Sequence, residues 1–143
     1  DRADVVFIDD YAHHPGELRA LITGAKTLFR QRKCTVLFQP HLFSRTRDLA
    51  DGFAEVLSLA DEVVLLPVYP ARELPVEGVN SEMVLDKMTI PHKSVKEKAA
   101  LLHWIKEQYA PSVNKEFGEL LIAAGAGDID TLVEPIKNLL KEI

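Results

Sequence analysis

Four short apolar runs constrain the fold of this sequence more than any other feature. They are nearly continuous in apolar character rather than alternating with polar residues, and they span residues 3–8, 34–38, 62–66 and 119–124. A strand that is buried on both faces, as in a parallel sheet, has this pattern. Apolar residues recur at helical spacing over residues 18–29, 49–60, 95–109 and 129–140. This alternation predicts an α/β fold, with an open, mostly parallel sheet, helices on both faces and right-handed crossovers.

Residues suited to helix N-termini mark where the expected helices start. They are Pro15 at a first helical position, Ser94–Glu97 as a capping box, and Ser44 and Asp128 as N-caps. A weaker helix is expected near residues 81–87, and an edge strand, where proline is tolerated, near residues 89–92. No repeat, low-complexity tract or linker divides the chain, so residues 1–143 are expected to form a single domain.

Composition excludes several classes of protein. With 17 Lys and Arg against 22 Asp and Glu, the chain lacks the basic surface that binds nucleic acid without sequence specificity. Its single cysteine, Cys34, excludes an internal disulfide and a cysteine-based zinc site, and its apolar surroundings predict a buried, inert thiol. No apolar run approaches the roughly 20 residues needed to span a bilayer, so no membrane partner is expected. The start at Asp1, without an initiator methionine or a signal-peptide pattern, is expected of a piece of a longer cytoplasmic chain.

Polar side chains are concentrated in the segments that follow the expected strands. These segments are residues 9–15, 39–47, 67–73 and 125–128. The carboxyl ends of parallel strands meet at one edge of a sheet, and ligands of open α/β folds bind there. The four segments therefore predict one shared functional surface.

The segment after the first run leaves several alternatives open. Asp9, Asp10, His13 and His14 are candidate metal ligands. The same carboxylates suit the hydroxyl groups of a ribose, and a His near a helix N-terminus suits a phosphate. In the simplest alternative, Asp9 caps the turn and one of the two His residues caps the helix.

The segment after the second run favours an anion site. Arg45 and Arg47 fall in the expected first turn of a helix, where cations oppose the helix dipole. A small carboxylate or a phosphate bound between the free N–H groups and a guanidinium would offset that cost. His41 is expected to orient this loop or to contact the anion. The alternative for Arg47 is a surface ion pair with Asp48 or Asp51.

The segment after the last run, Gly125–Asp128, has a strand–turn–helix pattern with two glycines. It lacks the third glycine of the dinucleotide fingerprint, and the chain contains no phosphate-binding P-loop motif. We interpret the segment either as a tight turn that ends in an Asp cap or as a close approach of the backbone to a ligand.

Taken together, three of these motifs resemble the C-terminal domain of the Mur ligases. They are Asp9–Pro15, Phe38–His41 with Ser44–Asp48, and Gly125–Ile129, in that order. The first motif is shared with folylpolyglutamate synthases, whereas the second is more specific to the alanine-adding branch of the Mur ligases. The resemblance covers essentially all 143 residues and implies a Rossmann-like domain.

The resemblance also implies an enzyme and its reaction. A three-domain ligase of peptidoglycan synthesis would use ATP and Mg²⁺ to join L-alanine to the carboxylate of UDP-N-acetylmuramate through an acyl phosphate. Its N-terminal domain would hold the UDP-sugar, and its central domain would hold the P-loop and the Mg²⁺ sites. This third domain would close over ATP and deliver the amino acid. Without the central domain, the chain alone is expected to be inactive.

Site residues are implied by the resemblance position by position. Asp10 and His13 match positions that contact ATP. Tyr11 and His13 match the catalytic positions that face the nucleotide phosphates and the incoming alanine. His41 and Arg45, together with Tyr11, match the loop positions that hold the amino-acid substrate by its carboxylate.

One position departs from the family pattern. Many relatives have an Arg directly after the His of the second motif, whereas this chain has Leu42. Arg47 or Arg72 could replace that guanidinium, and Asp128 is a further candidate site residue. No metal ligand is expected within this chain.

Several other functions remain open at this stage. They are another Mur-type ligase, a folylpolyglutamate synthase domain, and an amino-acid-binding module without catalysis. A receiver-type domain would need an Asp and a Lys where the chain has Pro67–Tyr69 and Gly125–Gly127. A metal-dependent hydrolase would draw on Asp9, Asp10, His13, His14 and His41.

Overall fold

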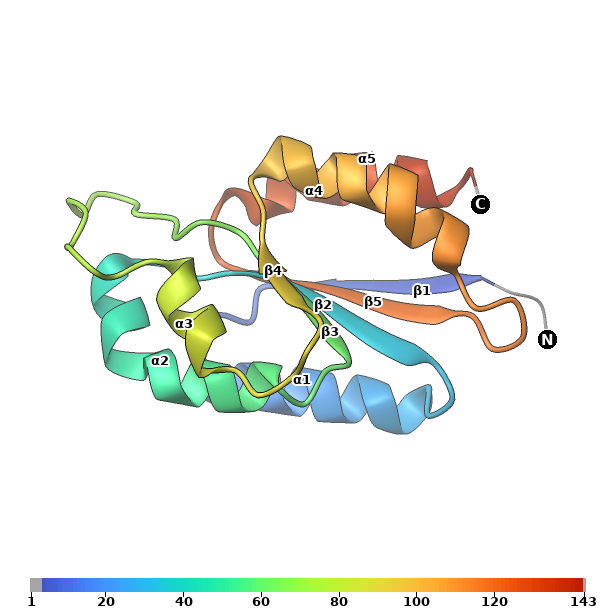
Figure 1. Ribbon diagram of the computed structural model, residues 1–143, viewed down its shortest axis with the longest axis horizontal. Helices are drawn as coiled ribbons and strands as arrows, with labels where there is room; N and C mark the ends of the chain where they lie inside the picture. The colour runs from blue at the N-terminus through green and yellow to red at the C-terminus, as the bar shows by residue number, and fades with distance from the viewer. Residues whose placement is uncertain (1–3, 143) are drawn as a thin grey trace.

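The computed structural model describes residues 4–142 and confirms an α/β fold built on one parallel sheet (Figure 1). Its five strands lie in the order β1-β5-β2-β3-β4, and every neighbouring pair is parallel. The strands are β1 (Val5–Asp10), β2 (Lys33–Gln39), β3 (Glu62–Leu65), β4 (Lys93–Val95) and β5 (Glu119–Gly125). The four predicted apolar strands correspond to β1, β2, β3 and β5. The predicted start of the first strand at Ala3 lies outside the described residues.

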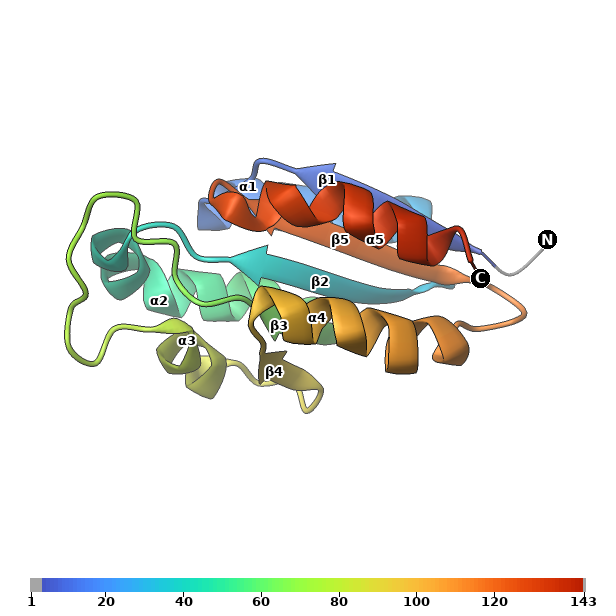
Figure 2. The same cartoon turned by 90° about the horizontal axis from the view of Figure 1, so that it is seen from above.

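Helices cover both faces of the sheet, as predicted (Figures 1 and 2). Helices α1, α2 and α3 pack on one face, and α4 and α5 pack on the other. The helices are α1 (Pro15–Leu28), α2 (Phe43–Leu57), α3 (Ser81–Lys87), α4 (Lys98–Trp104) and α5 (Val133–Leu140). Shorter turns flank the last two: a π-helical turn (Ile105–Tyr109) and 3-10 turns (Ala110–Ser112 and Asp128–Leu132). No helix in the described part of the chain is long and apolar enough to cross a bilayer.

The last strand fills the place between the first two strands. β5 pairs with β1 on one side and with β2 on the other, so that Ala124 lies opposite Asp10 and Phe38. The chain leaves β1 and β2 toward one face, and it leaves β5 toward the opposite face. The loops therefore diverge on either side of the end of β5, which is where open α/β sheets hold their ligands.

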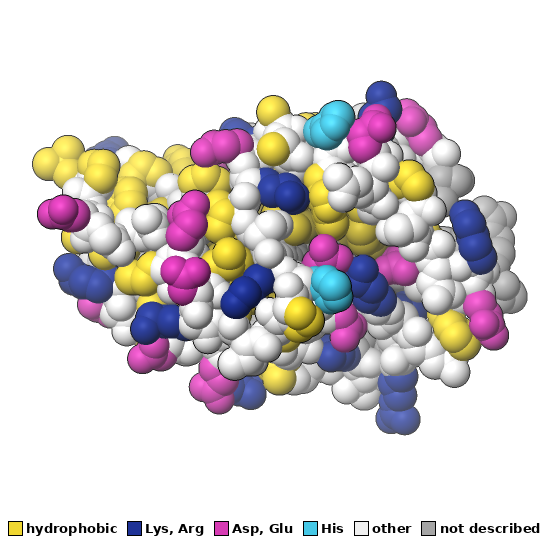
Figure 3. Space-filling view, viewed as in Figure 1, with side chains coloured by type: hydrophobic (Ala, Val, Ile, Leu, Met, Phe, Trp, Pro, Cys, Tyr) yellow, Lys and Arg dark blue, Asp and Glu magenta, His cyan; other side chains and the backbone are white. Residues whose placement is uncertain are grey.

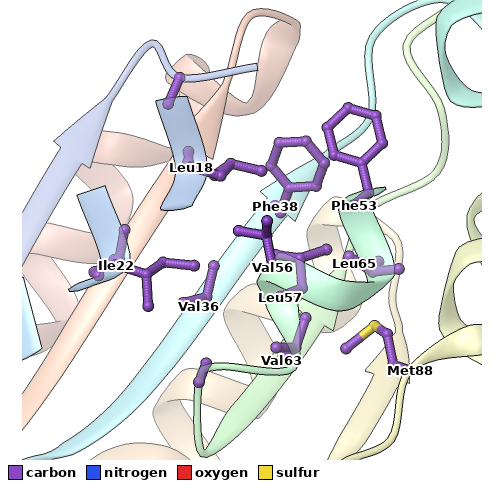
Figure 4. Packing of buried hydrophobic residues seen from close by; sticks show 14 of the residues in the cluster. Leu18, Ile22, Val36, Phe38, Phe53, Val56, Leu57, Val63, Leu65 and Met88 are labelled. Atoms are coloured by element: carbon purple, nitrogen blue, oxygen red, sulfur yellow. The ribbon is translucent and has the colours of Figure 1, made fainter. Parts of the chain in front are cut away.

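Two hydrophobic clusters hold the helices to the sheet, one on each face. Because side chains alternate along a strand, Val36 and Phe38 join the cluster of α1 and α2, whereas Leu37 joins the cluster of α4 and α5. The rings of Phe38 and Phe53 lie 5.3 Å apart between their centroids at the centre of the first cluster (Figure 4). The central strands are buried on both faces, and this explains their continuous apolar runs.

Two predicted boundaries around β4 are wrong. The edge strand is Lys93–Val95 rather than residues 89–92, and Ser94 therefore lies in a strand instead of capping a helix. The Ser94 backbone is paired with β3, so it does not adopt the helix start that a capping box requires. Helix α4 begins only at Lys98, with Glu97 at its N-cap.

The N-caps expected at Ser44 and Asp128 are also wrong. The N-cap of α2 is Leu42, whose side chain makes no capping hydrogen bond, and Ser44 lies inside the first turn. Asp128 is the first residue of a 3-10 turn that is preceded by Gly127. In both cases the polar side chain binds a partner far away in the sequence: Ser44 binds Glu73, and Asp128 binds Gln39 of β2 and Lys98 of α4.

Two other helix starts agree with the sequence. Pro15 begins α1, and His14 caps this helix because its Nδ1 atom accepts a hydrogen bond from the Gly16 N–H (3.3 Å). Helix α3 spans the predicted residues 81–87, and the side chain of Asn80 caps it. Local sequence fixes these starts because the capping groups lie within the same short segment.

The thiol of Cys34 is predicted to be unreactive while the chain is folded. Cys34 is completely buried in β2, and burial raises the pKa of its thiol to about 12. A thiol that stays protonated and inaccessible does not attack a thiol-specific dye near neutral pH. We expect labelling only after unfolding in denaturant, with one thiol per chain. Rapid labelling of the folded chain would contradict this prediction.

Substitution of Gly24 should stabilise the fold. Gly24 is exposed in the middle of α1, and a Cβ atom there would meet nothing within 4 Å. Gly24→Ala should raise the free energy of unfolding by about 0.5–1 kcal/mol, measured by urea denaturation, because Gly disfavours a helix interior. The control is Gly118→Ala, which should destabilise the chain because φ is +79° and the Cβ would lie 2.5 Å from the Asp4 oxygen. Lower stability of Gly24→Ala would refute the prediction.

Candidate functional site

Four rings from three loops form a row at the carboxyl edge of the sheet. Tyr11 and His13 follow β1, His41 follows β2, and Tyr69 follows β3. Their centroids are separated by 5.3 Å from Tyr11 to His13 and by 6.3 Å from His13 to His41. The row ends where His41 stacks on Tyr69 at 5.7 Å, with 13° between the ring planes. The predicted meeting of the loops after the first three apolar strands is therefore confirmed.

Backbone pairing beyond the ends of β2 and β3 fixes the last pair of rings. His41 and Tyr69 form an isolated parallel bridge. The Tyr69 N–H donates to the Pro40 carbonyl (2.8 Å), and the Leu42 N–H donates to the Tyr69 carbonyl (2.8 Å). These bonds position the His41 ring against the Tyr69 ring before α2 begins.

Leu42 turns the chain sharply into α2. Its φ is 71° and its ψ is 133°, a conformation that residues other than glycine rarely adopt. The Leu42 carbonyl accepts hydrogen bonds from the N–H (3.1 Å) and the hydroxyl (2.8 Å) of Thr46, which help to hold the strained residue. The turn brings Arg45 back toward His41, so that its Nη1 atom lies 3.3 Å from His41 Nδ1.

His41 is held in its neutral form with a defined tautomer. A guanidinium only donates hydrogen bonds, so Nδ1 of His41 accepts from Arg45 and the ring hydrogen lies on Nε2. Burial, followed by the positive charge of Arg45 and by that of His13 whenever His13 is protonated, lowers the pKa of His41 below its ordinary value, although Glu73 opposes this shift. Arg45 and His41 Nε2 therefore offer two hydrogen-bond donors beside one another, which suits a carboxylate.

His13 has the opposite hydrogen-bonding role. Its Nδ1 atom lies 3.0 Å from the Tyr11 carbonyl, which only accepts, so this nitrogen carries the hydrogen. Glu17 lies behind the same nitrogen at 3.6 Å and also accepts the His13 backbone N–H (3.1 Å). Nε2 of neutral His13 is then an acceptor, and it can take a proton from an amine.

Asp10 and Tyr11 lie on the far side of His13, beside β5. One oxygen of Asp10 accepts the Ala12 N–H (2.8 Å), and the side chain of Tyr11 is exposed. A cavity of about 190 Å³ opens here between the ends of β1 and β5. Its lining combines carboxylates with apolar side chains and consists of Asp9, Asp10, Tyr11, Ala123, Gly125, Ile129, Asp130 and Val133.

Gln39, the last residue of β2, joins the segments that follow β3 and β5, a role that the sequence did not reveal. Its side chain accepts the Ile129 N–H (2.9 Å) and donates to Asp128 (2.8 Å) and to the Pro67 carbonyl (3.3 Å). The turn before Asp128 needs glycine, because a Cβ on Gly127 would lie 2.5 Å from the Gln39 side-chain oxygen. The glycines are therefore required by a close approach of protein groups.

Asp128 is held by side chains from other elements. Burial opposes its ionisation, but hydrogen bonds from Lys98 and Gln39 outweigh burial and keep the pKa of Asp128 below its ordinary value. Lys98 Nζ lies 2.9 Å from one carboxylate oxygen, and Gln39 lies 2.8 Å from the other. With both oxygens engaged, Asp128 fixes the turn after β5.

Three other candidates are not members of the row of rings. Arg47 is exposed and pairs with Asp48 at 3.0 Å, as the simpler alternative predicted. Arg72 is exposed on the loop between β3 and α3 and makes no side-chain hydrogen bond to the described residues. His14 caps α1. Among residues 4–142, no three His, Cys, Asp or Glu side chains lie close enough to hold a metal ion.

Glu73, on the loop between β3 and α3, was given no role by the sequence patterns. Its carboxylate accepts the N–H (3.1 Å) and the hydroxyl (2.5 Å) of Ser44 at the start of α2. The free N–H groups expected to bind an external anion are therefore partly occupied. Beyond Glu73 the loop projects from the molecule (Figure 1), and hydrophobic side chains gather at that end of the surface (Figure 3). Leu74 and Val76 of this loop are exposed. The sequence signal that could have revealed Glu73 is the start of α2, where two Arg residues and no acidic residue leave the helix dipole without a compensating negative charge.

Comparison with known proteins identifies the family. Residues 1–128 match the family model described as Mur ligase, glutamate ligase domain. UDP-N-acetylmuramate–L-alanine ligases of Flavobacterium johnsoniae and Parabacteroides distasonis are both 51% identical to this chain, over 138 and 136 residues. The matches cover 96% and 95% of this chain but only 29% and 28% of those proteins, so the chain spans less than a third of their length.

Solved structures show the same fold. The UDP-N-acetylmuramate-alanine ligase of Thermotoga maritima is 28% identical, with a TM-score of 0.62 over 96% of this chain and 26% of that chain. A murein peptide ligase from Psychrobacter arcticus, 19% identical, has a TM-score of 0.74 over 100% of this chain and 29% of that chain, and this likeness concerns the fold alone. With a family model that matches residues 1–128 and relatives at 51% identity, this chain belongs to the Mur ligase family, in its glutamate ligase domain.

Proposed function

We propose that this chain is the amino-acid-delivering domain of an ATP-dependent ligase that joins L-alanine to UDP-N-acetylmuramate. Relatives named for that activity support the proposal, and the observation that carries it is the contact of Arg45 with neutral His41 (3.3 Å) beside His13. Arg45 and His41 offer donors for a carboxylate, and His13 offers an acceptor for an ammonium group. A free amino acid carries both of these groups.

The proposed reaction forms an amide bond and is driven by ATP. The carboxylate of UDP-N-acetylmuramate takes the γ-phosphoryl group of ATP to form an acyl phosphate, and ADP leaves. The α-amine of L-alanine then attacks the carbonyl carbon, the amine loses a proton, and phosphate leaves. Water would hydrolyse the acyl phosphate, so a domain that closes over it protects the intermediate and holds the amine close to it.

Arg45 and three residues of the row, His41, His13 and Tyr11, have roles in this proposal. Arg45 binds the alanine carboxylate, and the Nε2–H group of His41 donates a second hydrogen bond to it. His13 accepts the proton that the amine loses, because Nδ1 is fixed as a donor to the Tyr11 carbonyl (3.0 Å). Tyr11, exposed beside His13, faces the nucleotide phosphates. The lowered pKa of His41 keeps this ring neutral, so that it can accept from Arg45 and donate to the substrate together.

ATP is assigned to the side of the site next to β1 and β5. Asp10 uses one oxygen for the Ala12 N–H, which leaves the other oxygen for a ribose hydroxyl. The adjoining cavity of about 190 Å³ has space for a sugar-sized group. Mg²⁺ would offset the phosphate charge when bound, and the proposal assigns it to the central domain, where a P-loop would hold the nucleotide.

The proposal treats residues 1–143 as one domain of a longer cytoplasmic enzyme of peptidoglycan synthesis. The share of the relatives' length that this chain spans, 28–29%, supports a chain with further domains for the UDP-sugar and the P-loop. The assays below also distinguish the alternatives. A different amino-acid specificity or a folylpolyglutamate synthase would give product with another substrate. A binding module without catalysis would give no product.

Arg45→Ala in the complete protein should weaken the use of L-alanine. Loss of one charge-assisted hydrogen bond, about 1.5–3 kcal/mol, should raise the alanine KM by about tenfold to a hundredfold. The KM values for ATP and UDP-N-acetylmuramate should not change, because Arg45 contacts neither in this proposal. Steady-state phosphate release measures all three constants.

The control for this variant is Arg19→Ala. Arg19 is an exposed arginine of α1 that pairs with Glu55 at 3.3 Å, away from the row of rings. Its removal should leave the alanine KM unaltered. An alanine KM for Arg45→Ala equal to that of the parent protein would rule out the proposed carboxylate contact.

The 143-residue chain by itself should not release phosphate when it is mixed with ATP, UDP-N-acetylmuramate and L-alanine. The chain contains no P-loop motif, and the acyl phosphate would form on the central domain. A coupled phosphate assay, with the complete protein as positive control, tests this expectation. Alanine-dependent phosphate release by the 143-residue chain would show that the domain assignment is wrong.

A further inference from the structure

We propose that Glu73 is a positioning residue for the amino-acid site, because it holds the start of α2 so that Arg45 remains on His41. This inference rests on the proposed function and deepens it. The hydrogen bonds of the Glu73 carboxylate come from Ser44 and not from the row of rings. It acts through Ser44, the residue directly before Arg45.

The start of α2 lacks the local groups that usually stabilise a helix N-terminus. Its N-cap, Leu42, makes no side-chain hydrogen bond, and its first turn contains no acidic residue. The same turn carries Arg45, and Arg47 follows at the start of the second turn, so that their positive charges oppose the helix dipole. A helix start of this kind needs a negative charge from elsewhere in the molecule.

Glu73 supplies both the missing cap and the missing charge. One carboxylate oxygen accepts the Ser44 N–H (3.1 Å), and the other accepts the Ser44 hydroxyl (2.5 Å). These two hydrogen bonds from Ser44, followed by a smaller contribution from Arg47, hold the pKa of Glu73 below its ordinary value. Glu73 is therefore ionised at neutral pH, although its side chain comes from a loop and not from the helix itself.

The loop is shaped to deliver this carboxylate. Ala71 has a φ of 54°, in the left-handed region that a residue other than glycine seldom occupies. The Glu73 N–H donates to the Pro70 carbonyl (2.9 Å) and closes the turn around Ala71. Tyr69, just before the turn, is fixed to the chain after β2 by two backbone hydrogen bonds of 2.8 Å. The strained turn at Ala71 is therefore held on one side by Tyr69 and on the other by Glu73, whose side chain reaches the start of α2.

The cap leaves the charge of Arg45 available. Among residues 4–142, Arg45 forms no ion pair with a carboxylate, and its side-chain partner is the neutral ring of His41. If Glu73 were absent, the first turn of α2 would lose its cap and fray, and Arg45 would move away from His41 toward water. The substrate carboxylate would then lose its guanidinium although Arg45 itself is unchanged.

Kinetics of the complete protein provide the first test. Glu73→Ala should raise the alanine KM by about tenfold, whereas kcat and the KM values for ATP and UDP-N-acetylmuramate should change less than about twofold. Glu73→Gln should rescue much of the loss, because its amide oxygen still accepts from Ser44. The matched control is Glu77→Ala on the same loop, an exposed residue whose side chain makes no hydrogen bond to the described residues.

The kinetic result can overturn the proposal in two ways. An unaltered alanine KM in Glu73→Ala would show that Arg45 keeps its place without the cap. Equal changes in every kinetic constant, without rescue by Glu73→Gln, would show that Glu73 supports only the fold. If Glu73→Ala does not fold, Glu73→Gln alone must still raise the alanine KM selectively, and failure to do so would overturn the proposal.

An NMR titration of His41 in the 143-residue chain tests the positioning without any substrate. Removal of the Glu73 charge alone would lower the pKa of His41, because that carboxylate raises it. Departure of Arg45 and entry of water would raise the pKa of His41, because burial and the charge of Arg45 now lower it. We expect a rise in Glu73→Ala, and a fall would refute the proposal. If the pKa rises but the complete protein makes no amide from L-alanine, the proposed function fails while the positioning role stands.

Discussion

The candidate site depends on backbone pairing that continues past the ends of β2 and β3. Without the bonds that Tyr69 makes to Pro40 and Leu42, His41 would lack its stacking partner and Leu42 would have less to hold its strained conformation. The start of α2 would then be free to change direction, and with it Arg45. The hydrogen bonds that extend the sheet thus help to set the contact of 3.3 Å between His41 and Arg45, which lies four residues after His41. The rigidity of the sheet extends into the loops that form the candidate site.

The order of the strands determines which distant groups can support that edge. Because β5 lies between β1 and β2, the turn after β5 reaches Gln39, whose partner Asp128 is 89 residues away in sequence. Gln39 is buried, and a buried amide must satisfy its donors and its acceptor. It does so by binding the turn after β5 and the carbonyl of Pro67, and the glycine at 127 makes room for it. The polar network links the nucleotide side of the proposed site to the amino-acid side.

Most of the fold could be predicted from the sequence because its strands and longer helices are defined by local periodicity. The buried strands β2 and β5 have continuous apolar runs, and α1 begins at Pro15 with a cap from the adjacent His14. The sequence wrongly placed caps at Ser44 and Asp128, because their side chains bind groups that are distant in the sequence. Tyr69 and Gln39 were missed for the same reason, since their contacts exist only once the strand order is known. The convergence of His13, His41 and Arg45 followed from parallel strands alone.

The start of α2 shows how a local conflict in the sequence can indicate a function. Stability alone would favour acidic residues in the first turn and a capping side chain at the N-cap, yet the chain places Arg45 in this turn, with Arg47 directly after it, and leaves the cap to another loop. An acidic residue within the same turn would lie next to Arg45 and would compete with a substrate carboxylate for the guanidinium. A carboxylate that reaches Ser44 from the β3 loop stabilises the helix and leaves Arg45 in contact with a neutral imidazole. The arrangement therefore gives up a local helix preference and keeps the Arg45 cation free of a carboxylate within the described residues, as the proposed contact with a substrate carboxylate requires.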